Sequence, residues 1–180
     1  MTCVDIHMLA GRTTGRGSCV IDGAVAAVEV PGLDAPHAIP TAAVPEWLAE
    51  LLGVGPRPRV HAPGVLIAHA AMLDRVLNIA EPDAGAIAEL IAPDRVSSRW
   101  LELLTAISAN LLARWRVEIR APGATTAAET LEVLDCAAAG LWMLQPGPTE
   151  EVTAGEEVVC LAPTTSTAVW TWLSRLATAG

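Results

Sequence analysis

The chain has 180 residues, of which 52% are hydrophobic and 17% are charged, so it can bury a sizeable core and does not read as a disordered protein. Its 11 basic residues, all of them arginine, stand against 20 acidic residues and give a net charge of -9. This balance argues against a general binder of nucleic-acid backbones, because such proteins need a concentrated positive field.

Alternating side chains predict a half-buried strand over Cys3–Leu9. A β-hairpin should follow, because Asp22-Gly23 separates two apolar runs and this dipeptide favours a type I′ turn. The polar, glycine-rich segment Gly11–Ser18 is expected to be an exposed loop. In the first strand, one face carries Val4, Ile6 and Met8, and the other carries Cys3, Asp5 and His7.

The middle of the chain is predicted to be mainly helical. After a connector at Pro31–Pro40, apolar residues at helical spacing predict helices over Thr41–Leu52 and over about Val65–Ile79. Pro82–Ala92 has the length and the proline boundaries of another short helix. Asp94 is the expected N-cap of a longer helix that reaches about Asn110.

The second half is predicted to be a β-meander closed by a helix. Arg114–Ala121 alternates polar and apolar residues at every position, with Trp115, Val117 and Ile119 facing the core. Short loops separate the later strands, which favours antiparallel pairing. The remaining elements are strands at Thr130–Cys136, Leu141–Gln145 and Val158–Leu161, and a helix from about Thr164.

Together these elements predict an α+β fold. Its antiparallel β-sheet should combine the N-terminal hairpin with the C-terminal meander, and α-helices should flank it. The length is that of one ordinary domain, so we expect a single α+β domain over residues 1–180, divisible into lobes 1–80 and 81–180.

The sequence shows no convincing catalytic constellation. No G-x-S-x-G motif occurs, and paired carboxylates such as Glu150-Glu151 are typical of solvated charge clusters. We therefore expect no enzymatic activity, no cofactor and no metal site. The alternative is a small enzyme, or a domain that binds a small molecule or a metal, with a site around Cys3, Asp5 and His7 on one face of the first strand.

Arginines are the candidates for contact with a protein partner. Arg12 and Arg16 lie on the glycine-rich loop, and loops on a rigid sheet commonly carry recognition residues. Arg114 and Arg116 lie on the outward face of their strand, where they can dock against an acidic partner. The equally open alternative is that Glu132, on the neighbouring strand, neutralises this face within the chain.

Several features favour a cytoplasmic protein. The run Met1–Ala10 contains Asp5 and His7 and has no basic region before it, unlike a secretory signal. No 18-residue stretch is free of charges and prolines as a membrane span would be, so no membrane partner is expected. The cysteines lack metal-site spacing, and we expect buried free thiols at Cys3, Cys19, Cys136 and Cys160.

Four stretches in the last third of the chain follow a recognisable order. They are Arg-Trp-Arg-Val-Glu-Ile-Arg from Arg114, Glu-Val-Leu-Asp-Cys-Ala-Ala-Ala-Gly-Leu-Trp from Glu132, Val-Val-Cys-Leu-Ala-Pro from Val158, and a final Val-Trp-x-x-Leu helix. This segment, Arg114–Leu176, resembles the C-terminal part of the EspG family, the cytosolic secretion-associated chaperones of actinobacterial type VII (ESX) systems. The arginine that commonly follows the turn glycine in that family is Leu141 here.

The resemblance implies an antiparallel sheet flanked by helices, in a protein that binds a partner without chemistry. The implied role is that of a chaperone or adaptor for an exported helical protein. EspG-like folds carry two related halves, so a chain of this length is expected to cover its sheet edge or an apolar helical face by pairing with a second copy as a homodimer. The lysine-free composition, rich in Ala, Val, Arg and Pro, fits a high-GC actinobacterial genome.

Overall fold

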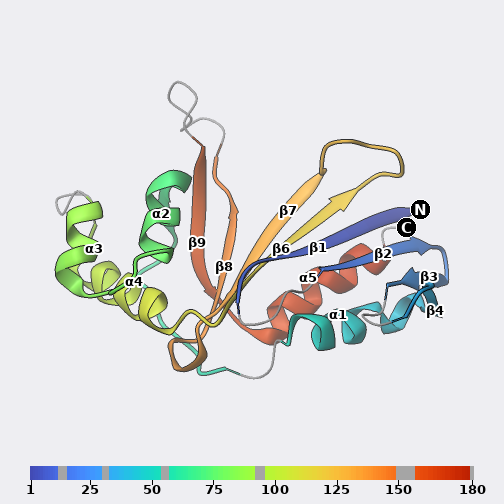
Figure 1. Cartoon of the computed structure of the whole chain (residues 1–180), viewed down its shortest axis with the longest axis horizontal. Helices are drawn as coiled ribbons and strands as arrows, with labels where there is room; N and C mark the ends of the chain where they lie inside the picture. Colours follow the sequence, from blue (N-terminus) through green and yellow to red (C-terminus); the bar gives the residue numbers. More distant parts are fainter. Residues whose placement is uncertain (12–15, 30–32, 54–56, 92–95, 149–156, 179–180) are drawn as a thin grey trace. The chain divides into compact units, whose positions relative to one another are not determined.

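The chain mixes strands and helices along its length. A computed structural model describes residues 1–11, 16–29, 33–53, 57–91, 96–148 and 157–178 (Figure 1). The strands of this part of the chain are β1 (Thr2–Gly11), β2 (Arg16–Asp22), β3 (Val25–Val28), β4 (His37–Pro40), β5 (Leu66–His69), β6 (Ala113–Arg120), β7 (Glu129–Asp135), β8 (Leu141–Pro146) and β9 (Val158–Thr164). The helices are α1 (Val44–Leu52), α2 (Ala70–Leu77), α3 (Ala84–Leu90), α4 (Ser98–Asn110) and α5 (Ser166–Thr178), with short 3-10 turns η1 (Thr41–Ala43) and η2 (Ala137–Ala139).

The nine described strands form one antiparallel sheet in the order β4-β3-β2-β1-β6-β7-β8-β9-β5. The N-terminal strands β1 to β4 follow one another in space as in sequence, and so do β6 to β9. The α+β class, with an N-terminal hairpin region, a C-terminal meander and flanking helices, is confirmed.

The chain divides into two compact units, each built from separate segments. Unit 1 comprises Met1–Pro56, Arg114–Glu132 and Thr165–Gly180, and unit 2 comprises Arg57–Ala113 and Val133–Thr164. Whether the chain behaves as the expected single domain is a question of cooperative unfolding, and it stays a prediction.

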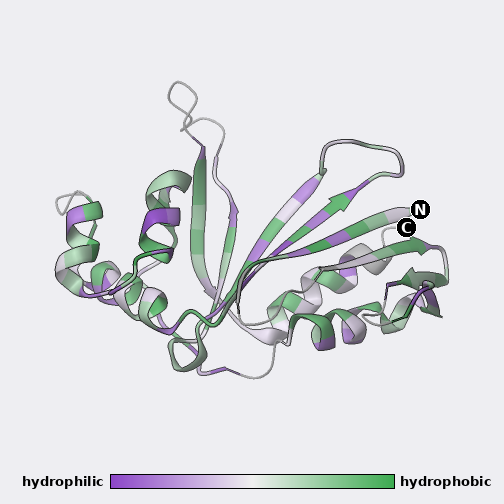
Figure 2. Cartoon of the chain, viewed as in Figure 1, coloured by the Kyte–Doolittle hydropathy of each residue, from purple (hydrophilic) through white to green (hydrophobic). Residues whose placement is uncertain are grey.

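In unit 1, helices cover one side of the strands. Helices α1 and α5 contact each other (Figure 1), and their apolar residues are buried together with the inward residues of the strands. Hydrophilic and hydrophobic residues follow one another along β1 and β6 (Figure 2), so one side of each strand is apolar and the other is polar. The buried apolar residues are Val4, Ile6, Cys19, Ile21, Ala26, Val28, Val44, Leu48, Leu52, Trp115, Val117, Ile119, Leu131, Val169 and Leu173.

In unit 2, helices α2, α3 and α4 build a separate core with strands β5, β7, β8 and β9. The Trp100 and Trp142 rings lie near its middle, with centroids 6.0 Å apart. The Trp142 indole is fully buried and donates a hydrogen bond from Nε1 to the carbonyl of Ala139 at 2.9 Å. The cluster comprises Leu66, Ala68, Leu73, Val76, Leu77, Ile87, Ile91, Trp100, Leu103, Leu104, Ile107, Leu134, Cys136, Trp142, Leu144 and Leu161.

The hairpin expected at Asp22-Gly23, between β2 and β3, is confirmed, but its turn type is not. Asp22 pairs with Val25, so the two loop residues are Gly23 and Ala24. Gly23 has a φ of 60°, whereas Ala24 is not among the residues with positive φ. A type I′ turn needs positive φ at both positions, and the observed pattern is that of type II′.

Two short strands were not anticipated. The connector expected at Pro31–Pro40 contains β4, and the helix expected from Val65 begins only at Ala70, after strand β5. Both strands have four residues, which is too short for alternation to be distinguished from helical spacing. Pairing with β3 and β9 supplies the hydrogen bonds that decide the outcome.

Side-chain caps correct the expected beginnings of two helices. Helix α4 begins at Ser98, and the hydroxyl of Ser97 caps it by accepting from the Trp100 N–H at 3.2 Å. Asp94, the expected N-cap, lies outside the described residues. In α3 the cap is Asp83, whose carboxylate accepts from the Ala86 N–H at 2.8 Å. Serine and aspartate are both strong N-caps, so composition alone does not choose between neighbouring candidates.

Candidate protein-binding surface

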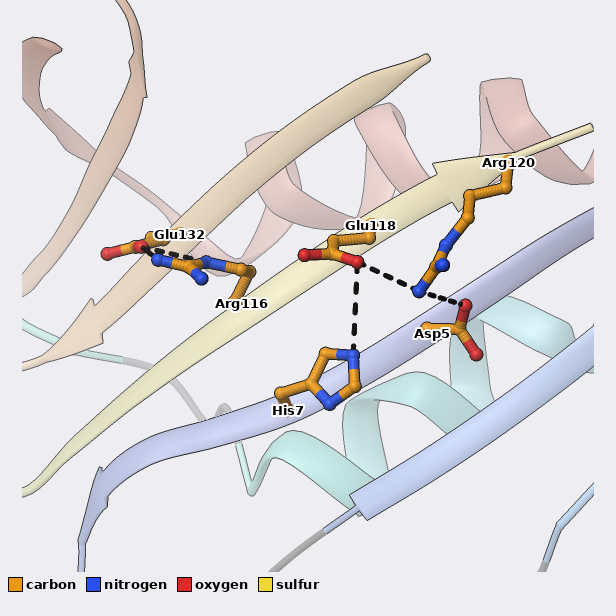
Figure 3. A network of polar contacts seen from close by, with 6 residues as sticks. All are labelled: Asp5, His7, Arg116, Glu118, Arg120 and Glu132. Atoms are coloured by element: carbon orange, nitrogen blue, oxygen red, sulfur yellow. Dashed lines mark hydrogen bonds and ion pairs between the residues drawn. The ribbon is translucent and has the colours of Figure 1, made fainter. Parts of the chain in front are cut away.

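The side of β1, β6 and β7 opposite the core of unit 1 carries a row of charged side chains. We call it the polar face, and it consists of Asp5, His7, Arg114, Arg116, Glu118, Arg120 and Glu132 (Figure 3, which omits Arg114). Alternation places these residues there, because their strand neighbours Val117 and Ile119 point into the core. The expectation that Cys3, Asp5 and His7 share a side is consistent with burial of Val4 and Ile6.

Glu132 joins two arginines across neighbouring strands. Its carboxylate accepts from Arg114 Nε at 2.7 Å, from Arg116 Nη2 at 2.8 Å and from Arg116 Nε at 3.1 Å. The Glu132 and Arg114 side chains are only 11% and 13% exposed, whereas Arg116 is 40% exposed. The alternative in which Glu132 pairs with these arginines within the chain is therefore borne out, and Arg116 is the more exposed of the two arginines.

Arg120 and His7 continue the row between β1 and β6. Arg120 Nη2 lies 2.9 Å from Asp5 Oδ2 and 3.0 Å from Glu118 Oε2 (Figure 3). His7 Nε2 lies 4.0 Å from the same Glu118 oxygen. The Asp5, Glu118 and Arg120 side chains are partly exposed, so the ion pairs among them add little stability.

The arrangement does not gather the residues of the alternative enzyme or metal site. Asp5 faces Arg120, and His7 faces Glu118. Among the described residues, no three His, Cys, Asp or Glu side chains lie close enough to hold a metal ion. The charged side chains instead form opposite-sign pairs along the sheet surface.

Both ends of the Gly11–Ser18 segment, which was expected to be a loop, belong to strands. Strand β1 reaches Gly11 and β2 begins at Arg16, which pairs with His7, so Arg16 belongs to a strand and Arg12 lies outside the described residues. Gly17 is buried, and a Cβ there would overlap the Leu51 side chain of α1. Close packing against α1 therefore explains the glycine at position 17.

The ion pair between Arg57 and Asp135, in unit 2, was not anticipated. Arg57 donates from Nε and Nη2 to the two carboxylate oxygens of Asp135, each at 2.8 Å, and Asp135 also accepts from the Ala137 N–H at 3.1 Å. Burial alone would raise the pKa of Asp135, but these hydrogen bonds hold it below its ordinary value. Arg57 stands in Gly-Pro-Arg-Pro-Arg, and nothing in that stretch indicates its partner.

The four cysteines are free, but only two of them are buried. Cys19 and Cys136 are buried, and Cys3 and Cys160 are half-buried. Burial raises the pKa of Cys19 to about 11 and that of Cys136 to about 12, so both thiols stay protonated at neutral pH. The expectation of free thiols holds, while full burial is wrong for Cys3 and Cys160.

Comparisons with known proteins show a likeness of fold. No protein-family model and no curated protein matches the chain. No helix in the described residues is both long and apolar enough to cross a membrane. Among solved structures, the chain is similar to the Mycobacterium tuberculosis type VII secretion system chaperone EspG5, solved in complex with a PE25–PPE41 dimer. The TM-score is 0.57 at 13% identity, and the match covers 97% of this chain and 71% of the other.

Proposed function

We propose that the chain is a non-enzymatic chaperone or adaptor that binds an exported helical protein in the cytosol. The observation that carries this proposal is the likeness to EspG5, which extends over 97% of this chain, well beyond the C-terminal segment whose sequence resembles the family. A fold by itself does not determine function, so the proposal also needs a surface able to recognise a protein.

The polar face supports the proposal because its charges are paired yet partly accessible. Arg116 keeps 40% of its side chain exposed while Glu132 holds it in place, and an arginine fixed in this way can add a contact to a partner at low cost in conformational entropy. Arg114 is mostly buried beside Glu132, so its part is to position that carboxylate. We also propose Arg12 and Arg16 as contacts with the partner.

Affinity capture of the tagged chain from its native host, followed by identification of co-purifying proteins, tests the proposal. A helical protein that is found outside the host cell should co-purify in a stoichiometric complex, and the complex should re-form from the two purified proteins. Failure to recover such a complex, or recovery of an enzyme substrate that the chain converts, would contradict the proposal.

Variants then locate the binding surface. Arg116→Ala should keep the thermal melting curve of the parent chain and weaken the re-formed complex, because exposed substitutions change stability by only about 0.5 kcal/mol. The double variant Arg12→Ala/Arg16→Ala should also weaken the complex. Arg59→Ala is the matched control, since Arg59 is exposed but lies in unit 2. Equal affinity of all three variants for the partner would show that Arg12, Arg16 and Arg116 do not contribute to binding.

A further inference from the structure

The two outer strands of the sheet, β4 and β5, offer different backbone edges. An edge strand presents N–H and C=O groups that no neighbouring strand pairs, and proteins commonly protect such edges with proline or charge. The register of each strand on its neighbour shows which residues direct these groups outward.

The β4 edge is protected by proline. The Thr41 N–H donates to the Ala24 carbonyl at 3.0 Å, and Pro40 stands opposite Val25. Because hydrogen-bonded and non-bonded pairs alternate along an antiparallel ladder, positions 36, 38 and 40 direct their backbone outward. Two of these positions are Pro36 and Pro40, which have no N–H, so this edge offers the single amide of Ala38.

The β5 edge has no such protection. The Ala70 N–H donates to the Glu157 carbonyl at 2.9 Å, and Ile67 stands opposite Cys160, so the same alternation directs the N–H and C=O of Ile67 away from β9. The side chains of Ile67 and of Val65, which precedes the strand, are 44% and 56% exposed. The strand Leu66–His69 contains neither proline nor an acidic, lysine or arginine side chain.

We propose that β5 pairs antiparallel with β5 of a second copy of this chain, about a two-fold axis at Ile67. Identical strands are complementary in this arrangement, because position 67 faces itself and position 65 faces position 69. Each outward N–H then meets an outward C=O, and the two exposed Ile67 side chains meet on one side of the joined sheets. This proposal does not depend on the proposed chaperone function.

The absence of acidic, lysine and arginine side chains in β5 favours a second copy as the occupant of this edge. The small area that the contact can bury predicts a weak dimer. A strand without acid, lysine or arginine meets its own copy without like-charge opposition. Four residues and their flanks bury less than the roughly 1,200 Å² of a standard interface, so association should be reversible and concentration-dependent. Each chain carries a net charge of -9, and salt screens the repulsion between them, so added salt should strengthen the dimer.

Sedimentation equilibrium of the full chain, from low micromolar to sub-millimolar concentration, tests the proposal. The apparent mass should rise from 18.7 kDa toward twice that value. Ile67→Pro should weaken association at least about tenfold, because it removes the outward N–H without removing a bond to β9. Ala38→Pro makes the same change on the β4 edge and should leave association unchanged.

Two further variants keep the test decisive if proline disturbs β5. Ile67→Lys puts like charges opposite each other at the axis and should also give monomers, with a parental circular dichroism spectrum. Ile67→Cys in a Cys160→Ser background should form a covalent dimer on mild oxidation, because an antiparallel hydrogen-bonded pair has a Cα separation of about 5.5 Å. The Cys160→Ser change removes the competing thiol opposite position 67.

A strictly monomeric mass at every concentration would overturn the proposal. So would a dimer that Ile67→Pro and Ile67→Lys leave intact, or one that only Ala38→Pro weakens. Dimerisation that weakens with added salt would point instead to attraction between opposite charges and would also contradict pairing through β5.

Discussion

Arg57 and Asp135 lie 78 residues apart in the chain and are joined by two parallel hydrogen bonds of 2.8 Å. The Asp135 side chain is 8% exposed, while Arg57 is 28% exposed. The same part of unit 2 contains another close contact, because Gly140 lies against Val60 and the Pro58 carbonyl. The segment after Arg57 is thus fixed to the turn between β7 and β8 at two points.

Removing the guanidinium should destabilise unit 2. Arg57→Ala leaves a buried carboxylate without its charged partner, and breaking a fully buried pair costs about 3–5 kcal/mol. Because Arg57 is partly exposed, we expect about 2 kcal/mol, measured by urea denaturation. Arg59→Ala, an exposed arginine two residues further on, should change the free energy of unfolding by less than about 0.5 kcal/mol. Equal effects of the two variants would contradict this role of Arg57.

Acid should weaken the fold through Asp135. Its pKa is lower in the folded than in the unfolded chain, so the unfolded chain binds the proton first as pH falls. The stabilisation is fully present above the ordinary aspartate pKa of about 3.9 and is lost as pH falls through the lower folded value. Asp135→Asn should therefore flatten the dependence of unfolding free energy on pH in that window. Asp34→Asn, at an exposed aspartate, is the control, and an equal flattening there would refute the assignment.

Two glycines allow backbone strain and steric contact to be separated. Gly140 has a φ of 86°, and a Cβ there would lie 2.6 Å from Val60 Cγ2 and 2.9 Å from the Pro58 carbonyl oxygen. Gly23 has a φ of 60°, but a Cβ there would meet nothing within 4 Å. Gly23→Ala should cost about 1 kcal/mol of strain, and Gly140→Ala should cost about 1–2 kcal/mol more because of the contacts. Equal losses of unfolding free energy in the two variants, measured by urea denaturation, would show that Val60 and Pro58 move aside without a measurable cost.

Tryptophan fluorescence can decide whether the two units unfold together. Trp100 and Trp142 belong to unit 2, and the remaining tryptophans of the sequence fall in the segments of unit 1. In the double variant Trp100→Phe/Trp142→Phe, emission therefore reports on unit 1 alone, while circular dichroism reports on the whole chain. The single-domain prediction requires the two denaturation curves to coincide. Separate midpoints would show two independently unfolding units.

Much of the fold could be predicted from periodicity alone. The strand around Trp115 and the helix around Leu104 follow their expected spacing, and their inward residues are buried. Long-range contacts carry no local signal, so the Arg57–Asp135 pair was missed. Trp172 lies three residues after the buried Val169 on α5 and is only half-buried, whereas Trp142 is fully buried. These two positions differ because packing between elements, and not spacing within one element, decides burial.

The candidate surface was predictable only in part. Alternation along β6 placed Arg114 and Arg116 on the polar face, and Glu132 was a visible candidate for pairing with them. The contacts of Asp5 with Arg120 and of His7 with Glu118 depend on β1 lying beside β6, a neighbourhood that the sequence order does not imply. The partners of Asp5 and His7, two of the three residues of the alternative metal site, could therefore not be predicted.

The central claim is tested most directly by isothermal titration calorimetry. The measurement is the dissociation constant between the Arg116→Ala variant and the partner recovered from the host. If the polar face binds a protein, Arg116→Ala should weaken the complex by about tenfold or more, while Arg59→Ala binds as the parent chain does. Identical dissociation constants for the parent chain and Arg116→Ala would contradict binding through the polar face.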